Sequence, residues 1–118
     1  MIELKNVTKK YGKGEQEVVA LDDISLNIPN NGLLVMTGES GSGKTTLLNI
    51  ISGIDTNTSG SINGIKKEEV SFIFQDCQLL EKLSIEDNLL LCCNDKIMIN
   101  NSLTKVGLEK YKNKRINE

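Results

Sequence analysis

Eight consecutive residues in the first half of the chain constrain its fold more than any other feature. Residues 38–45 read Gly-Glu-Ser-Gly-Ser-Gly-Lys-Thr, which matches the pattern G-x-x-x-x-G-K-[ST] without a mismatch. The apolar run 33–37 precedes the glycines, and residues 46–51 follow with apolar side chains at helical spacing. A buried strand, a glycine-rich loop and a helix in this order form the setting in which such a loop binds phosphate. The sequence therefore predicts a phosphate-binding loop, the P-loop.

Each part of this loop has a chemical role. Glycines let the backbone adopt angles closed to other residues and approach an anion closely, and the amides then form a nest for it. The helix that begins near Lys44 adds the positive end of its dipole. We expect Lys44 to contact the β- and γ-phosphates, and Thr45 to bind Mg²⁺ through its hydroxyl. The residues expected to contact the nucleotide here are Gly38, Glu39, Ser40, Gly41, Ser42, Gly43, Lys44, Thr45 and Thr46.

Composition limits the other possibilities. A chain of 118 residues can form one small domain or part of a larger one, and its net charge of −2 gives no reason to expect a nucleic-acid partner. No apolar stretch reaches the roughly 18 residues of a membrane span, and the first residues lack a signal-peptide layout, so we expect a cytoplasmic location. Histidine is absent. The three cysteines match no zinc or redox spacing, so we expect Cys77, Cys92 and Cys93 to be reduced, the last two in an apolar helix.

Hydrophobic patterning predicts the order of the elements. Segments 2–7 and 18–28 are expected to be antiparallel strands joined by a polar turn over 9–17. After the P-loop helix, which should stop at Gly53, the loop 55–60 leads to a brief strand over 61–64. A further strand over 70–74 and two helices follow. The helices are expected over 85–93 and over 98–106, the second ending at Gly107.

Five segments, in order and spacing, resemble the ATP-binding domains of ABC (ATP-binding cassette) transporters. They are residues 6–12, 20–26, the P-loop followed by Thr-Leu-Leu, 58–62, and 72–76 continuing to 88. The last of these is similar to the family's Q-loop segment. The resemblance covers the whole chain, and its closest likeness is to bacterial exporter subunits that serve peptides, lipoproteins or antibiotics.

The resemblance implies an α/β fold. It comprises a partial P-loop NTPase core, an N-terminal antiparallel β subdomain and the start of an α-helical subdomain. Residues 1–37 would form a strand-rich part that binds the nucleotide base, 38–75 would run from P-loop to Q-loop, and 76–118 would begin the helical subdomain. Segment 61–69 is short for the family.

The resemblance also assigns site residues. Tyr11 would stack on adenine, and Val19 would pack against the base or ribose. Gln75 would reach Mg²⁺ and the attacking water, which makes it, with Lys44, a catalytic candidate and, with Thr45, a metal candidate. The cofactors would be ATP and Mg²⁺. The partners would be transmembrane transporter subunits and a second cassette in a homodimer, at the inner face of the cell membrane.

Other parts of the family's machinery have no counterpart in the sequence. It contains no Leu-Ser-Gly-Gly-Gln signature, no apolar run ending in Asp-Glu, and no switch histidine. We therefore expect the N-terminal half of a cassette, ending just before the signature. We also expect exposed strand edges, and little or no nucleotide binding and no hydrolysis by this chain alone.

The leading hypothesis is thus the ATP-binding subunit of an ABC transporter. Three alternatives stay open. One is a soluble cassette ATPase, and another is a stand-alone, non-catalytic nucleotide-binding or interaction module. The third is a small kinase or GTPase, against which stand the strand-rich start and the absence of an Asn-Lys-x-Asp motif.

Overall fold

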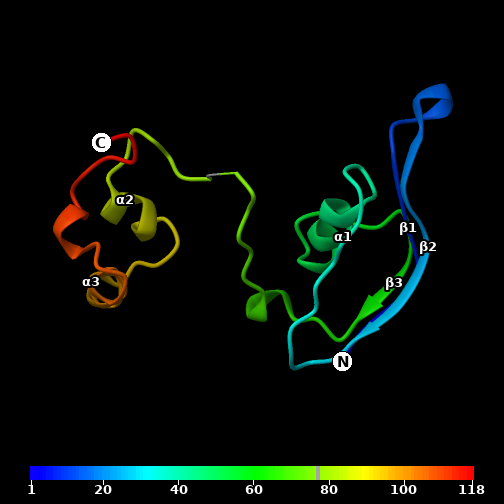
Figure 1. Ribbon diagram of the computed structural model, residues 1–118, viewed down its shortest axis with the longest axis horizontal. Helices are drawn as coiled ribbons and strands as arrows, with labels where there is room; N and C mark the ends of the chain where they lie inside the picture. The colour runs from blue at the N-terminus through cyan, green and yellow to red at the C-terminus, as the bar shows by residue number, and fades with distance from the viewer. Residues whose placement is uncertain (77) are drawn as a thin grey trace. The chain divides into compact units, whose positions relative to one another are not determined.

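The chain folds into two compact units. The computed structural model describes residues 1–76 and 78–118, and these divide into Met1–Ile73 and Phe74–Glu118 (Figure 1). The first unit carries the β-sheet and the P-loop helix, and the second is made of short helices. No helix among these described residues is both long and apolar enough to cross a membrane. The predicted reduced Cys77 lies outside the described residues.

An antiparallel sheet dominates the first unit. Strand β1 (Ile2–Tyr11) pairs with β2 (Val18–Ile28) on one side and with β3 (Ser59–Asn63) on the other (Figure 1). The predicted strand over 18–28 is confirmed at both ends. The first strand is longer than predicted, so the turn between β1 and β2 shrinks to a few residues around the 3-10 helix Gly14–Gln16. The brief strand predicted over 61–64 is also confirmed, although it begins two residues earlier, at Ser59.

An irregularity in β1 explains why its sequence alternates imperfectly. The pairing of β1 with β2 shifts register between Leu4 and Val7. At this point Asn6 and Asp23 both have positive φ, and the Asn6 side-chain amide donates a hydrogen bond to Asp23 Oδ1 over 2.7 Å. A bulge of this kind changes which side chains face inward. Leu4 and Val7 are consequently both buried, although they are three residues apart.

The hydrophobic core lies between the sheet and helix α1 (Lys44–Ile51). Leu4 and Val7 of β1 and Leu21 of β2 pack with Leu47 and Ile50 of α1. Because these apolar side chains recur at helical spacing along α1, one face of the helix is buried against the sheet. This packing fixes the P-loop, which leads into α1. The helix ends as predicted, since Ser52 caps it and Gly53 follows with φ +78°.

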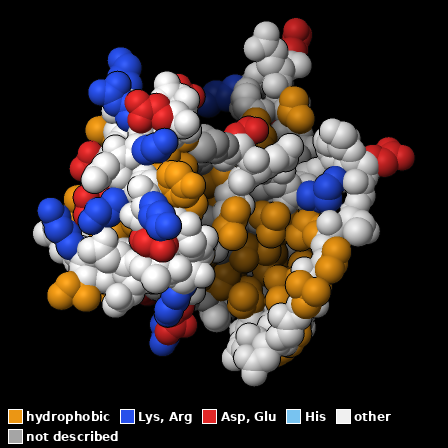
Figure 2. Space-filling view, turned by 60° about the vertical axis from the view of Figure 1, so that its left-hand side comes forward, with side chains coloured by type: hydrophobic (Ala, Val, Ile, Leu, Met, Phe, Trp, Pro, Cys, Tyr) orange, Lys and Arg blue, Asp and Glu red, His pale blue; other side chains and the backbone are white. Residues whose placement is uncertain are grey.

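Two strand predictions are wrong. Segments 33–37 and 70–74 contain apolar runs, but neither forms a strand or joins the sheet of β1, β2 and β3. Leu33 is 90% exposed and Ile73 is 96% exposed. A strand exists only as part of a hydrogen-bonded ladder, so an apolar pattern cannot form one without a neighbouring strand. Hydrophobic side chains therefore remain in broad patches at the surface (Figure 2).

The second unit is built from α2 (Ile85–Leu90), α3 (Lys96–Lys105) and the 3-10 helix Glu109–Tyr111. The helix predicted over 98–106 is confirmed with an earlier start. The helix predicted over 85–93 ends at Leu90, so Cys92 and Cys93 lie beyond it, and both are free thiols. The break has a local cause. Asp95 is extended, and its carboxylate accepts hydrogen bonds from the backbone of Ile97 and Met98, which starts a new helix.

A buried asparagine organises the start of α2. Asn88 is 7% exposed. Its Oδ1 accepts a hydrogen bond from the backbone N–H of Leu80 over 2.8 Å, and its Nδ2 donates to the carbonyls of Leu80 and Ser84 over 3.1 and 2.9 Å. Nδ2 also lies 3.4 Å from the carbonyl of Leu83, so one side chain contacts four backbone groups of the turn that precedes the helix.

Candidate functional site

The P-loop joins the end of segment 33–37 to the first turn of α1. Gly43 is the residue before the helix and has φ +92°, and Gly41 has φ +81°. A Cβ on Gly43 would stand 2.5 Å from the carbonyl oxygen of Ala20 on β2 and 3.0 Å from a methyl carbon of Leu21. Only glycine fits this position, because both the backbone angle and the space forbid a side chain. The P-loop is thereby packed directly against β2.

Lys44 folds back over its own loop. Its ammonium donates hydrogen bonds to the carbonyl oxygens of Gly38 and Glu39 over 2.7 and 2.6 Å, and to Ser42 Oγ over 3.1 Å. The backbone N–H of Ser42 also donates to the carbonyl of Glu39 over 3.2 Å, which closes a turn within the loop. The Lys44 ammonium and the loop backbone therefore lie together, and the binding of phosphate by these residues stays a prediction.

The start of α1 presents donors to the same place. The first hydrogen bond of the helix runs from the N–H of Leu47 to the carbonyl of Gly43. The amides of Lys44, Thr45 and Thr46 come before it and have no partner within the helix. Thr45 is exposed and Thr46 is half-buried. Amides, an ammonium and a hydroxyl are the donor set that suits a polyphosphate with Mg²⁺. The residues present therefore fit both predicted groups.

Tyr11 is the last residue of β1 and is 41% exposed. Its hydroxyl donates a hydrogen bond to Asp55 Oδ2 over 2.8 Å. The sheet register pairs Tyr11 with Val18, and it pairs Lys10 with Val19. Directly paired residues share a face of the sheet and neighbours along a strand alternate. Val18 is therefore the valine opposite Tyr11, and contact of Val19 with the base or ribose stays a prediction.

Asp55 and Lys9 form the charged pair of the first unit with the most hydrogen bonds, and neither residue was predicted from the sequence to belong to the site. The Lys9 ammonium donates to Asp55 Oδ1 over 2.7 Å and to the carbonyl of Thr56 over 2.6 Å. Hydrogen bonds from Lys9, Tyr11 and the backbone of Thr56 lower the pKa of Asp55 to about 2. The position of Lys9 could have indicated its role. It lies two positions before Tyr11 in β1, so the two side chains share a face of the strand.

Gln75, the predicted Q-loop residue, is exposed and lies in a bend of the second unit. The P-loop, Tyr11 and Val19 belong to the first unit. The role of Gln75 toward Mg²⁺ and water stays a prediction.

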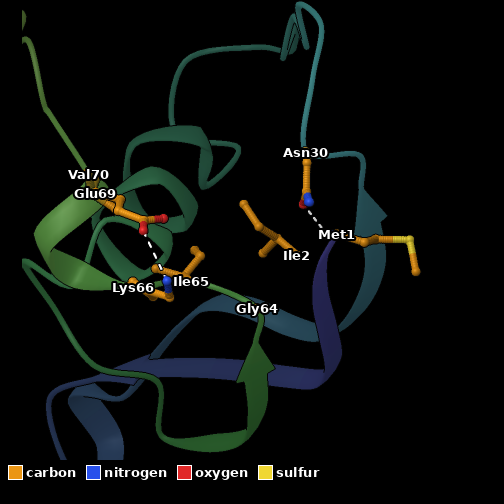
Figure 3. Close-up of a pocket in the computed structure, with 8 residues that line it drawn as sticks. All are labelled: Met1, Ile2, Asn30, Gly64, Ile65, Lys66, Glu69 and Val70. Atoms are coloured by element: carbon orange, nitrogen blue, oxygen red, sulfur yellow. Dashed lines mark hydrogen bonds and ion pairs between the residues drawn. The ribbon is translucent and has the colours of Figure 1, made fainter.

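The first unit also contains a cavity of about 520 Å³ near the N-terminus, and the residues that line it in Figure 3 do not belong to the P-loop. The terminal amine of Met1 donates to Asn30 at its rim, and Lys66 pairs with Glu69 over 3.1 Å. The charged side chains that line it thus compensate one another. This cavity lacks the convergent donors that the P-loop has.

The sequence is similar to proteins of known family. Residues 21–118 match the family described as ABC transporter. The macrolide export ATP-binding/permease protein MacB of Neisseria gonorrhoeae is 41% identical over 106 positions, covering 77% of this chain and 16% of that protein. The ABC transporter ATP-binding protein YxdL of Bacillus subtilis is 36% identical over 138 positions, covering 98% of this chain and 53% of that protein.

The chain thus spans at most about half the length of these two relatives. The alignment with YxdL also has more positions than this chain has residues, so the chain has gaps relative to YxdL. That segment 61–69 accounts for a gap stays a prediction.

Solved structures share the fold. The ATP-binding cassette MJ0796, in a dimeric structure of a post-hydrolysis state bound to ADP and Pi, is similar with a TM-score of 0.78 at 28% identity. The match covers 99% of this chain and 62% of that one. A second dimeric structure of MJ0796 gives a TM-score of 0.80. The fold is therefore α/β and of the P-loop NTPase type, with an antiparallel β-sheet in its N-terminal part, as predicted.

Proposed function

The chain belongs to the ABC transporter family of ATP-binding cassettes, and on that premise we propose that it binds Mg-ATP through residues 38–46. The observation that carries the proposal is the position of the Lys44 ammonium, which lies on the carbonyls of Gly38 and Glu39 inside the loop. A cation held on neutral carbonyls can exchange them for phosphate oxygens, which are stronger acceptors. We propose ATP as the nucleotide because the chain belongs to a family of ATP-binding cassettes.

Different residues of the chain would bind different parts of Mg-ATP. The amides of the loop and of the first turn of α1 would hold the α- and β-phosphates, and Lys44 would hold the β- and γ-phosphates. The Thr45 hydroxyl and Gln75 would be ligands of Mg²⁺, which neutralises phosphate charge when it is bound. Tyr11 would stack on the adenine, with Val19 at the base or ribose. Lys44 and Gln75 remain the catalytic candidates.

In the whole protein, we propose that ATP hydrolysis drives transport across a membrane through transmembrane partner subunits. The name of MacB, an ATP-binding/permease protein, supports a membrane partner, and the dimeric cassette MJ0796 supports a cassette homodimer. The second unit offers apolar surface for a partner, including Ile97 and Val106, which are both exposed. The subunit would then lie in the cytoplasm against the inner face of the membrane.

Equilibrium binding of Mg-ATP tests the proposal. Calorimetric titration at high nucleotide concentration should give a weak but measurable affinity for the unaltered chain, and Lys44→Ala should weaken it further by a factor of about ten or more, because a charge-assisted contact is lost. Lys5→Ala is the matched control, since Lys5 is an exposed lysine on β1 whose ion-pair partner among the described residues is Glu3. An affinity unaffected by Lys44→Ala would contradict the proposal.

A further inference from the structure

The side chain of Asp55 connects two groups that the proposed function treats separately. One carboxylate oxygen accepts the hydroxyl of Tyr11 over 2.8 Å, and the other accepts the ammonium of Lys9 over 2.7 Å. The pair of Lys9 and Asp55 is the least exposed of the ion pairs described in the structure. Burial makes such a pair more rigid than a surface pair and less sensitive to salt.

Lys9 also acts on the ring of Tyr11 directly. Its ammonium lies 4.8 Å from the ring centroid, within the range of a cation–π contact. Lys9 and Tyr11 are two positions apart on β1, which places both side chains on one face of the strand. The ring is therefore held at its hydroxyl by Asp55 and over one face by Lys9. Since Tyr11 is still 41% exposed, the opposite face is the one left for a planar ligand.

Asp55 is itself anchored to the P-loop helix. Its backbone N–H donates to the carbonyl of Asn49 in α1 over 3.1 Å, and the N–H of Thr56 donates to its carboxylate over 2.7 Å. One end of α1 is the P-loop, and the other leads within a few residues to Asp55. A continuous path of packed helix and hydrogen bonds therefore joins the phosphate site to the ring of Tyr11.

We propose that Asp55, together with Lys9, is a positioning residue for the nucleotide base: it fixes the Tyr11 ring so that its open face receives the adenine. This inference rests on the proposed function, because Asp55 and Lys9 would support the same site at which Tyr11 is proposed to bind the base. A ring held in advance loses little conformational freedom on binding, so the support raises the affinity for a nucleotide that has a base. It leaves the affinity for phosphates alone unchanged.

The test compares ATP with inorganic tripolyphosphate, which has the phosphates and no base. Tyr111→Phe makes Tyr11 the only fluorescent aromatic side chain besides phenylalanine, because the sequence has two tyrosines and no tryptophan. In that background, Mg-ATP should quench the emission of Tyr11, and Mg-tripolyphosphate should not. Both affinities are also measured by calorimetry.

In the Tyr111→Phe background, Asp55→Ala should weaken ATP binding about fivefold or more, the scale of one lost hydrogen bond. Tripolyphosphate affinity should stay within about twofold. Asp55→Asn keeps an oxygen that can accept the Tyr11 hydroxyl and should recover most of the loss. Lys9→Met should weaken ATP binding in the same selective way. Asp22→Ala, which removes an exposed carboxylate of β2, is the matched control and should change neither affinity.

Two results would overturn the positioning role. One is an ATP affinity that Asp55→Ala leaves unchanged. The other is an equal loss of ATP and tripolyphosphate binding, which would mean that Asp55 acts on the fold or on the phosphate site. Failure of the unaltered chain to bind either ligand would instead overturn the proposed function, and the positioning role with it.

Discussion

The carbonyl oxygen of Ala20 on β2 lies 2.5 Å from the point where a Cβ on Gly43 would stand. The neighbour of Ala20 is Val19, a residue predicted to contact the base, and Gly43 is the last residue of the P-loop before α1. A glycine without a side chain therefore brings the phosphate-binding loop against the strand expected to bind the base. The first prediction tests this contact between distant parts of the sequence.

Gly43→Ala should lower the free energy of unfolding by about 3 kcal/mol, because it combines a strained positive φ with a clash against backbone. Gly41→Ala is the matched control. Gly41 has φ +81° but nothing within 4 Å of an added Cβ, so it should cost only about 1 kcal/mol. Urea unfolding measures both. Equal losses of unfolding free energy in the two variants would show that the contact with Ala20 is not the reason why position 43 requires glycine.

Thr45→Ala should weaken ATP binding about tenfold in the presence of Mg²⁺ and leave binding in EDTA unchanged, because only the metal-dependent contact is removed. Removing Mg²⁺ should weaken binding to the unaltered chain as well. Thr45→Ser keeps the hydroxyl and should bind like the unaltered chain. Calorimetric titration with and without EDTA gives all of these affinities. An identical loss in EDTA would argue against a metal contact at Thr45.

Asp55 should make the stability of the first unit depend on acid pH. Its pKa falls from the usual 3.8 to about 2 in the folded chain, so the folded state binds the proton less readily than the unfolded state. The resulting stabilisation is fully present above pH 3.8 and is lost as the pH falls toward 2. The measurement is the difference in unfolding free energy between the unaltered chain and Asp55→Asn. It should be constant near neutral pH and shrink through this window, and a difference that stays constant down to pH 2 would refute the assignment.

Asn88→Ala should destabilise the second unit by about 2–4 kcal/mol, because it leaves backbone groups of the preceding turn without their buried partner. Asn101→Ala is the control, since Asn101 is exposed on α3. Hydrogen exchange supplies the readout. The amide of Leu80, which donates to Asn88 Oδ1, should lose its protection in Asn88→Ala and keep it in Asn101→Ala. Protection that survives Asn88→Ala would mean that another group holds the turn.

The sequence predicts those elements whose formation depends on local pattern. Strict alternation after Ile24 gives β2, and the glycines with Lys44 give the P-loop and α1. Segments 33–37 and 70–74 have equally apolar patterns, but a strand also needs a partner that a local pattern cannot provide. The prediction of strands over both segments, made from the apolar pattern, was therefore wrong.

Other features were invisible for different physical reasons. The end of α2 depends on Asp95, whose carboxylate starts α3, a competition between helices that periodicity does not reveal. The support of Tyr11 by Asp55 joins residues 44 positions apart. No sequence motif contains both residues, so their contact becomes visible only in the folded chain.

The hydrogen bonds of Lys44 within its own loop have a calorimetric consequence. Because the ammonium already rests on two carbonyl oxygens, a phosphate does not meet a freely hydrated cation; it takes the place of existing acceptors. Contacts broken inside the loop then cancel part of the heat released by contacts made to the ligand. Binding at this loop should release less heat than the number of new hydrogen bonds suggests, and replacement of loosely held water should carry a correspondingly larger share of the affinity.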